Sequence, residues 1–241
     1  NFINDIIESD SGNLWIATNY GLNRYNPMTG HFEVFLADSS GSSIPENGVF
    51  NLYQDDKGFI WIKTMHYLTR FNSDSGNFKS YKHAADDFYY EGDNNFAILR
   101  DHDGKLWIGT KDGLNYFNES QGQFQRFQHK ESEKQSLSNN NIQEISEDNQ
   151  GNLWIGTESG LNKYNRNTGS FERYYIDSVN IHHDMNSIID ICIDEEGLFW
   201  VGTYAGLYLF KRGEGIFEEP DKLLYDPSGL TDIQINEIRS F

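Results

Sequence analysis

The stretch GNLWIGTESGLNKYNRNTGSFERYY, from Gly151 to Tyr175, contains three short runs of apolar and aromatic residues separated by two clusters of turn-forming residues. Runs of this length with Gly and Asn between them predict three β-strands joined by tight turns. The same stretch recurs, with small changes, five times along the 241 residues. The repeat therefore decides the fold.

Tryptophan marks the period of this repeat. The five tryptophans are 46, 46, 47 and 46 residues apart, and they are Trp15, Trp61, Trp107, Trp154 and Trp200. A fixed period of about 40 to 50 residues with strand-type units is typical of a β-propeller, because a four-stranded sheet buries both faces only against neighbouring sheets. We expect the tryptophans to be structural residues that pack between blades, each burying on the order of 200 Å².

Each repeat contains four strand patterns, as the fourth repeat illustrates. It begins with the apolar run IQEIS at 142–146, followed by a turn from Asp148 to Gly151 and the strand that carries the tryptophan. A second turn ends at Gly160, and the third strand carries an aromatic residue, Tyr164. The third turn ends at Gly169, and the last strand follows at once. The Asp and Gly positions are those that a type I turn with a bulged glycine prefers.

The sequence thus predicts an all-β protein, a β-propeller of five four-stranded blades of about 46 residues. The expected blades are about 1–46, 47–92, 93–139, 140–185 and 186–232, with 233–241 as the first strand of a sixth. Both ends fall at the same phase of the repeat, since residues 2–7 align with residues 235–240. We therefore favour a segment of a larger propeller array over a self-closed ring of five blades.

Charge and apolar content exclude several partners. The chain has 37 acidic and 19 basic residues, a formal net charge of −18, which repels nucleic acid and anionic lipid headgroups. No run reaches the roughly 18 apolar residues of a membrane span, so we expect no membrane contact by this segment itself. The one cysteine, Cys192, has no partner for an internal disulfide, and we expect it to be a buried, inert thiol.

The repeat closely resembles the two-component regulator propeller repeat. The resemblance is carried by GNLWIGT at 151–157, by Gly160, Leu161 and Asn162, and by the following aromatic, Asn, Thr-Gly and Phe positions at 164, 165, 168, 169 and 171. It extends over the full chain.

The resemblance implies a place in a signalling protein. Such propellers form the periplasmic sensor region of hybrid two-component regulators in Bacteroidetes, including Bacteroides. They are followed by an immunoglobulin-like module, one membrane helix, a histidine kinase and a response regulator. The resemblance also implies an oligosaccharide ligand, self-association of the parent protein to a dimer, and anchoring of that parent in the inner membrane. It implies no cofactor.

Three carboxylates at one position of the first strand are candidates for chemistry. They are Asp5, Glu144 and Asp190, where the second and third repeats have Asn51 and Ala97. This column is expected to border the central channel. Glycosidic cleavage needs two carboxylates roughly 5 to 9 Å apart across one cleft. Because the repeats offer no clear acid and base pair, we expect no catalytic residues and no enzyme in this segment.

A metal site is also not expected. Three consecutive residues have side chains that can bind metal ions, namely His182, His183 and Asp184. Adjacent residues on an extended chain, however, point in opposite directions. Neighbouring imidazoles therefore rarely share an ion, and a solvated loop is the simpler interpretation.

The second repeat breaks the pattern twice. Lys63 stands where the other repeats have Ala or Gly, and Tyr67 stands where they have a turn glycine. A tyrosine at a glycine position predicts a different turn, which presents Met65 and His66. The connection that leaves this repeat contains three consecutive aromatic residues, Phe88 to Tyr90, and both segments are expected on one face of the propeller.

We therefore predict a ligand site on that face. Its expected residues are Lys63, Met65, His66, Tyr67, Phe88, Tyr89, Tyr90, Lys111 and Asp112. Aromatic side chains bordered by carboxylates and amides suit sugars, whose C–H faces stack while hydroxyls form hydrogen bonds. The predicted function is an oligosaccharide-sensing module that controls a kinase outside this segment. The alternatives are a protein–protein interaction scaffold and a polysaccharide-cleaving propeller enzyme.

Overall fold

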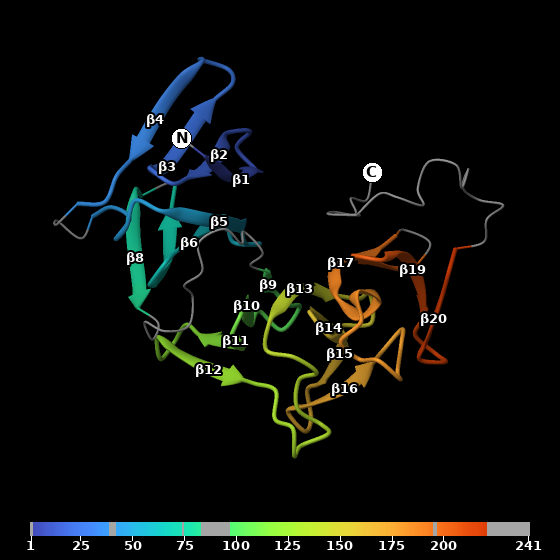
Figure 1. Ribbon diagram of the computed structural model, residues 1–241. Helices are drawn as coiled ribbons and strands as arrows, with labels where there is room; N and C mark the ends of the chain where they lie inside the picture. Colours follow the sequence, from blue (N-terminus) through green and yellow to red (C-terminus); the bar gives the residue numbers. More distant parts are fainter. Residues whose placement is uncertain (1, 39–41, 74, 83–96, 195–196, 221–241) are drawn as a thin grey trace. The chain divides into compact units, whose positions relative to one another are not determined.

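The computed structural model describes residues 2–38, 42–73, 75–82, 97–194 and 197–220. Its strands form five four-stranded antiparallel sheets, which confirms the predicted all-β propeller architecture with four strands per repeat (Figure 1). The chain divides into two compact units, Asn1–Asn94 and Asn95–Phe241, here called the N-terminal and C-terminal units. The expected sixth-blade strand at 233–241 and the candidates Phe88, Tyr89 and Tyr90 lie outside the described residues.

The N-terminal unit contains blades 1 and 2. Blade 1 has the strand order β1-β2-β3-β4, and blade 2 has the order β5-β6-β7-β8. The strands are β1 (Ile3–Glu8), β2 (Leu14–Thr18), β3 (Gly21–Asn26), β4 (His31–Phe35), β5 (Val49–Gln54), β6 (Phe59–Thr64), β7 (Tyr67–Asn72) and β8 (Asn77–Lys82).

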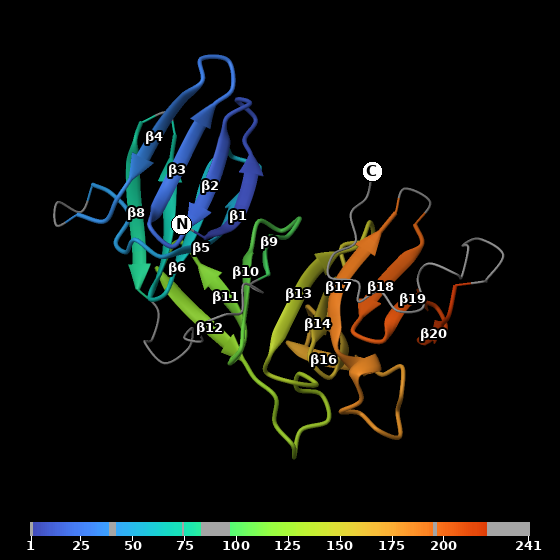
Figure 2. The same ribbon diagram turned by 45° about the horizontal axis from the view of Figure 1, so that its top comes forward.

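The C-terminal unit contains blades 3, 4 and 5, which consist of β9 to β12, β13 to β16 and β17 to β20. Their bounds are β9 (Ile98–Arg100), β10 (Leu106–Thr110), β11 (Gly113–Asn118), β12 (Gln123–Phe127), β13 (Ile142–Glu147), β14 (Leu153–Thr157), β15 (Gly160–Asn165), β16 (Ser170–Tyr174), β17 (Ile188–Ile193), β18 (Phe199–Thr203), β19 (Gly206–Lys211) and β20 (Ile216–Glu218). A short 3-10 helix, η1 (Asp184–Asn186), precedes β17. Figure 2 shows β13 and β17 side by side.

The turn aspartate of the repeat has a second role beyond the turn. In blade 3, the indole Nε1 of Trp107 donates a hydrogen bond to Oδ2 of Asp101 at 2.8 Å. The same bond is made in blades 2, 4 and 5, by Trp61 to Asp55, Trp154 to Asp148 and Trp200 to Asp194. One carboxylate thus fixes both the turn and the tryptophan, and this satisfies a buried N–H that would otherwise cost free energy.

Three of the tryptophans also pack on the next blade within their unit. The ring of Trp15 meets that of Phe71 edge-on at 5.2 Å, and Trp107 and Trp154 meet Tyr164 and Phe210 in the same way at 5.0 and 5.4 Å. Trp15, Trp61, Trp107 and Trp154 are buried. Trp200, in the last described blade, is half-buried. The repeat aromatics are therefore accounted for by packing.

The small residue after the tryptophan motif permits this close approach of blades. A Cβ atom on Gly156 would come within 2.8 Å of Cγ2 of Ile188 in the next blade, and one on Gly109 within 2.7 Å of Ile142. Such contacts are too short for carbon atoms, so either the neighbouring isoleucine or the glycine segment would have to move. A large residue at this position, such as Lys63 in blade 2, is therefore a genuine break in the pattern.

An arginine after the third strand joins neighbouring blades in the C-terminal unit. Nη1 of Arg166 lies 2.6 Å from Oδ2 of Asp101 in blade 3, and its Nη2 lies 2.7 Å from Glu147. Arg212 makes the equivalent contact with Asp148, at 3.1 Å. The turn aspartate of one blade thus anchors the arginine of the next.

Candidate functional site

The turn between β6 and β7 of blade 2 differs from the four equivalent turns. It contains Met65 and His66 between Thr64 and Tyr67. The other turns end at glycines with φ between 107° and 138°, which are Gly21, Gly113, Gly160 and Gly206. Tyr67 does not have a positive φ. The predicted change of turn is therefore present, because a residue with a Cβ rarely adopts the backbone conformation that glycine adopts there.

A glutamate replaces the usual cap of this turn. In blade 1 the hydroxyl of Thr18 accepts a hydrogen bond from the amide of Tyr20, and the pattern recurs in blades 3, 4 and 5. In blade 2 the amide of His66 instead donates to Oε2 of Glu46 at 2.9 Å, and Nδ1 of His66 lies 2.5 Å from Oε1. Glu46 therefore fixes the imidazole and the turn together.

The charge of Glu46 is stabilised by its partners. Burial alone would raise the pKa of this carboxyl, but hydrogen bonds from the Thr64 hydroxyl and from His66 outweigh it and hold the pKa below its ordinary value. Sequence reasoning missed Glu46. The available signal was a carboxylate three residues before β5, where blades 4 and 5 have Asn139 and Met185.

The candidate residues of blade 2 lie close together but are not equally accessible. Met65, His66 and Tyr67 are half-buried at the end of the hairpin. Lys63 is only 4% exposed and stands opposite Asn51 and Leu68 in the sheet. Burial lowers the pKa of Lys63 well below its ordinary value. The side chain of Lys63 thus lies in the interior next to the hairpin. Met65, His66 and Tyr67 form the partly exposed surface of the hairpin.

Lys111 and Asp112 lie on the equivalent turn of blade 3, in the C-terminal unit. Asp112 is held by its own blade, since Oδ2 lies 2.7 Å from Nη1 of Arg126 and Oδ1 accepts a hydrogen bond from Gln128 at 2.9 Å. These two residues and the blade 2 hairpin belong to different units. One site that contains both groups stays a prediction.

The carboxylates of the innermost strands bind backbone amides. Asp5 accepts bonds from the amides of Ile6 and Leu52, the latter in the next blade, both at 2.8 Å. Strand pairing shifts register just before each of these positions, for example between Ile188 and Asp190 in β17. Burial and the nearby charge of Asp190 raise the pKa of Glu144 to about 8. Glu144 is therefore mostly protonated at neutral pH.

The remaining sequence candidates lie in ordinary surroundings. His183 precedes the short helix η1, where its Nδ1 accepts a hydrogen bond from the amide of Met185. Within the described ranges, no group of three or more His, Cys, Asp or Glu residues is placed to hold a metal ion. Cys192 is half-buried and not buried as expected, but partial burial together with Asp190 and Asp194 raises its pKa, which keeps the thiol protonated. No helix in the described part of the chain is long and apolar enough to span a membrane.

The sheets, their turns and the inter-blade tryptophans define a β-propeller. Five segments of the chain match the family model of the two-component regulator propeller, at residues 1–20, 43–66, 90–112, 136–159 and 184–205. The chain therefore contains five matches to the two-component regulator propeller repeat, and the resemblance seen in the sequence is confirmed.

Solved structures with this fold include extracellular domains of proteins assigned as two-component or one-component systems. The extracellular domain of a protein assigned as a hybrid two-component system from B. thetaiotaomicron is 26% identical, with a TM-score of 0.69 over 90% of this chain and 30% of that chain. The extracellular domain of a protein assigned as a one-component system from the same organism is 21% identical, with a TM-score of 0.55 over 91% and 35%. This chain thus spans about a third of the length of these two relatives. No functionally curated protein matches the sequence.

An enzyme shares the fold at lower similarity. Virginiamycin B lyase from Staphylococcus aureus is 13% identical, with a TM-score of 0.62 over 88% of this chain and 67% of that one. A likeness at this identity shows the fold alone. The repeat match is to a two-component regulator propeller, and the first structure above is the extracellular domain of a protein assigned as a hybrid two-component system, so the comparisons favour a regulator-type propeller.

Proposed function

We propose that this chain is the extracytoplasmic ligand-sensing propeller of a hybrid two-component signalling protein, and that its ligand is an oligosaccharide. The observation that carries the proposal is the fivefold repeat match, together with similarity over 90% of the chain to an extracellular domain assigned to such a system. The parent protein is anchored in the inner membrane, and the propeller lies in the periplasm. Its kinase lies outside the present segment.

The hairpin end of blade 2 is the proposed contact surface. Tyr67 offers an aromatic face and a hydroxyl, and the imidazole of His66 is fixed by Glu46 at 2.5 Å. Aromatic faces stack on the C–H face of sugars, and side chains already fixed before binding lose little entropy when the ligand arrives. The break in the repeat at this hairpin supports a role that blade packing does not require.

Signalling requires a difference in affinity between two arrangements of the parent protein. A ligand shifts an equilibrium only by its differential affinity for the two states, and a few kcal/mol is sufficient. We propose that the oligosaccharide favours one arrangement of two parent chains in a dimer. That arrangement sets the activity of the kinase.

Calorimetry tests ligand binding by the 241-residue segment. The titrants are a panel of neutral and acidic oligosaccharides, and the variants are Tyr67→Gly, which restores the residue of the other repeats, and His66→Ala. Tyr20→Ala, at the equivalent turn of blade 1 in the same unit, is the matched control. We expect Tyr67→Gly to weaken binding about tenfold or more, as loss of an aromatic contact does. Unchanged binding in both variants would remove the blade 2 site, and absence of binding across the panel would remove the proposed function.

An exposed apolar face on blade 1 supports the idea of a longer array. Ile6 and Phe32 are 51% and 58% exposed, although Leu52 and Phe171 at the same repeat positions are 5% and 4% exposed. We propose that a further blade of the same kind covers this face. The same face also favours a second candidate function, a scaffold that docks a protein partner.

Hydrogen exchange separates these possibilities. Amides of β1 and β4 are expected to exchange more slowly in the full-length parent chain than in the 241-residue segment. Equal exchange in the two chains would contradict the longer array. Protection that develops only when a partner protein is added would favour the scaffold.

A further inference from the structure

Basic residues gather along the outer edges of blades 3 to 5 in the C-terminal unit. A hollow of about 850 Å³ lies between the turns of blades 3 and 4 and the strands β15 and β16. Lys134, Lys163, Arg166 and Arg173 line it, whereas Glu172 is the one carboxylate of its lining. Over the whole chain the proportion is reversed, with 19 basic and 37 acidic residues. The hollow is therefore a local exception to the charge of the protein.

Two further hollows adjoin the first. One of about 670 Å³ shares Lys134 with it and adds Arg126 and Lys130. The other, of about 490 Å³, shares Lys163 and adds Lys211 and Arg212. The three hollows together are here called the basic groove. The volume of each hollow lies in the range of about 300–1,000 Å³ that is usual for ligand sites.

Most of these cations already have carboxylate partners, but two in the central hollow, Lys163 and Arg173, have neutral ones. Arg173 donates to the backbone oxygen of Ser136 at 2.7 Å, to its hydroxyl at 2.7 Å and to the backbone oxygen of Glu133 at 2.9 Å. Nζ of Lys163 lies 5.4 Å from the ring centre of Trp154. Among the described residues, Lys134, Lys163 and Arg173 form no ion pair with a carboxylate. Their charges remain available to an anion.

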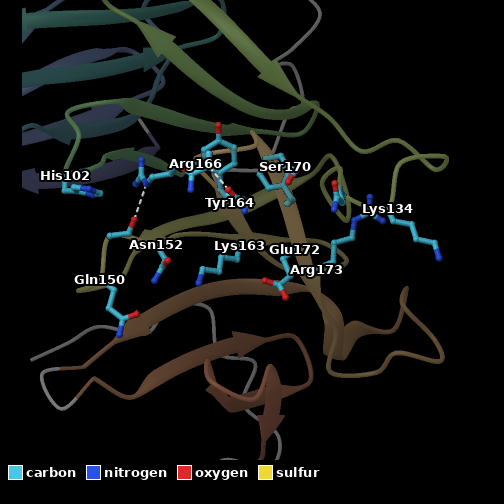
Figure 3. A pocket seen from close by; sticks show the side chains of 15 residues that line it. His102, Lys134, Gln150, Asn152, Lys163, Tyr164, Arg166, Ser170, Glu172 and Arg173 are labelled. Carbon is cyan, nitrogen blue, oxygen red and sulfur yellow. Dashed lines mark hydrogen bonds between the residues drawn. The ribbon is translucent and has the colours of Figure 1, made fainter.

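Hydrogen bonds hold the wall of the hollow in place. The connection between β12 and β13 runs along the outer strand of blade 4, where the amide of Phe171 donates to the backbone oxygen of Gln135 at 2.8 Å. The bonds of Arg173 fix the same segment. Figure 3 shows Lys134 and Arg173 at the end of the hollow away from His102, with Lys163, Asn152 and Gln150 along one side. Cations fixed in this way bind an anion with little loss of entropy.

Glu172 opposes anion binding and thus provides an internal test. It stands directly opposite Lys163 in the pairing of β15 with β16. Its carboxylate also accepts a hydrogen bond from the Tyr174 hydroxyl, and burial together with this bond raises the pKa of that phenol. Removal of its negative charge would leave the lining of the central hollow without a carboxylate.

We propose that the basic groove binds an acidic oligosaccharide, whose carboxylate or sulfate groups contact Lys134, Lys163 and Arg173. Side-chain amides such as Gln135 and Gln150 both donate and accept hydrogen bonds and suit the sugar hydroxyls. The proposal rests on the proposed function, to which it adds a second contact site, in the C-terminal unit, and the class of ligand that this site binds. The net charge of −18 does not prevent binding, because repulsion from distant carboxylates is screened beyond about 8 Å at physiological ionic strength.

The lining favours a sugar over an acidic peptide. The central hollow has no Leu, Ile, Val or Met side chain in its lining, and Phe171 is buried beneath it. Peptide grooves normally offer apolar pockets for anchoring side chains. A hollow lined by amides, hydroxyls and cations instead suits a polyhydroxylated anion.

Calorimetry with tetragalacturonate and with neutral maltotetraose tests the groove. We expect the 241-residue segment to bind the acidic sugar, to bind it more weakly as salt rises, and to bind the neutral sugar in the groove at least tenfold more weakly. The double variant Lys134→Gln/Lys163→Gln should lose about tenfold in affinity, and Glu172→Gln should gain severalfold. Lys79→Gln is the matched control, because Nζ of Lys79 lies 5.1 Å from the ring of Tyr81 but in the other unit.

Three other outcomes of these titrations would contradict the proposed groove. Binding of tetragalacturonate that is unchanged in the double variant would place the ligand elsewhere. Equal competition by a tetraglutamate peptide would contradict the choice of a sugar. Binding of neutral sugars that the Tyr67 variant weakens and the groove variants do not would overturn the groove while leaving the proposed function intact. A sulfated tetrasaccharide, used in parallel, shows which acidic group the groove prefers.

Discussion

Nη1 of Arg166 lies 2.6 Å from Oδ2 of Asp101, a residue 65 positions earlier in the chain and in the preceding blade. The Asp101 side chain is fully buried, and its carboxylate also holds the indole of Trp107. Burial opposes the charge of Asp101, but the bonds from Arg166 and Trp107 outweigh it and lower the pKa of the carboxyl. One carboxylate thus connects a turn, the core of its own blade and the next blade.

Loss of this arginine should destabilise the C-terminal unit. Arg166→Gln leaves Asp101 buried with one fewer charged partner, and we expect a loss of about 2–3 kcal/mol in the free energy of unfolding. Urea denaturation measures it. Lys130→Gln removes an exposed pair with Glu133 at 2.9 Å and serves as control, with an expected cost of roughly 0–1 kcal/mol. Equal costs in the two variants would show that Arg166 does not connect the blades.

The protonated carboxyl of Glu144 predicts a particular dependence of stability on pH. Its pKa rises from an ordinary value of 4.5 to about 8 in the folded protein, because of burial and the charge of Asp190. The folded state therefore holds a proton that the unfolded state releases, and the contribution of Glu144 to stability decreases as pH rises from about 4.5 to about 8. Glu144→Gln should remove this dependence.

Thermal unfolding at two pH values checks this. Near pH 9 the melting temperature of Glu144→Gln should exceed that of the wild type by at least about 2–4 °C, the shift that 1 kcal/mol produces in a chain of this size. Near pH 5 the two proteins should differ little. A variant less stable than the wild type at both pH values would contradict the assignment.

Glu46 should show the opposite dependence. Its lowered pKa means that the stabilisation is present above the ordinary pKa of a glutamate and is lost as pH falls through the folded-state value. We expect Glu46→Gln to cost about 1–2 kcal/mol at pH 7, since charge-assisted bonds to His66 and Thr64 are weakened. The difference should shrink in acid, and urea denaturation at several pH values measures it. A cost that stays constant down to pH 3 would indicate a purely steric effect.

Equivalent positions in blades 1 and 2 should differ in their response to truncation. Leu52→Ala removes a buried side chain and should cost about 2–4 kcal/mol, whereas Ile6→Ala should cost less than about 1 kcal/mol because Ile6 is 51% exposed. Urea denaturation of the 241-residue segment provides both values. A large cost at Ile6 would show that this face is covered within the segment itself.

The sequence was sufficient to predict the repeated units and to locate the blade 2 break. Periodic tryptophans and turn glycines are local signals, and Tyr67 in place of glycine correctly indicated a different turn. The contacts of Arg166 and Glu46 were not predictable, since they join residues far apart in sequence whose proximity depends on how blades stack. The basic groove was missed for the same reason, because its cations come from several strands and one connection. Burial of Lys63 likewise depends on packing that composition does not reveal.

The central claim is that ligand binding to this propeller sets the activity of a kinase. The most direct measurement is autophosphorylation of the full-length parent chain in membranes, with and without the oligosaccharide that the 241-residue segment binds. We predict a change of severalfold in the wild type, and a loss of that change in whichever variant abolishes binding to the segment. Identical phosphorylation with and without a ligand that the segment binds would contradict the account.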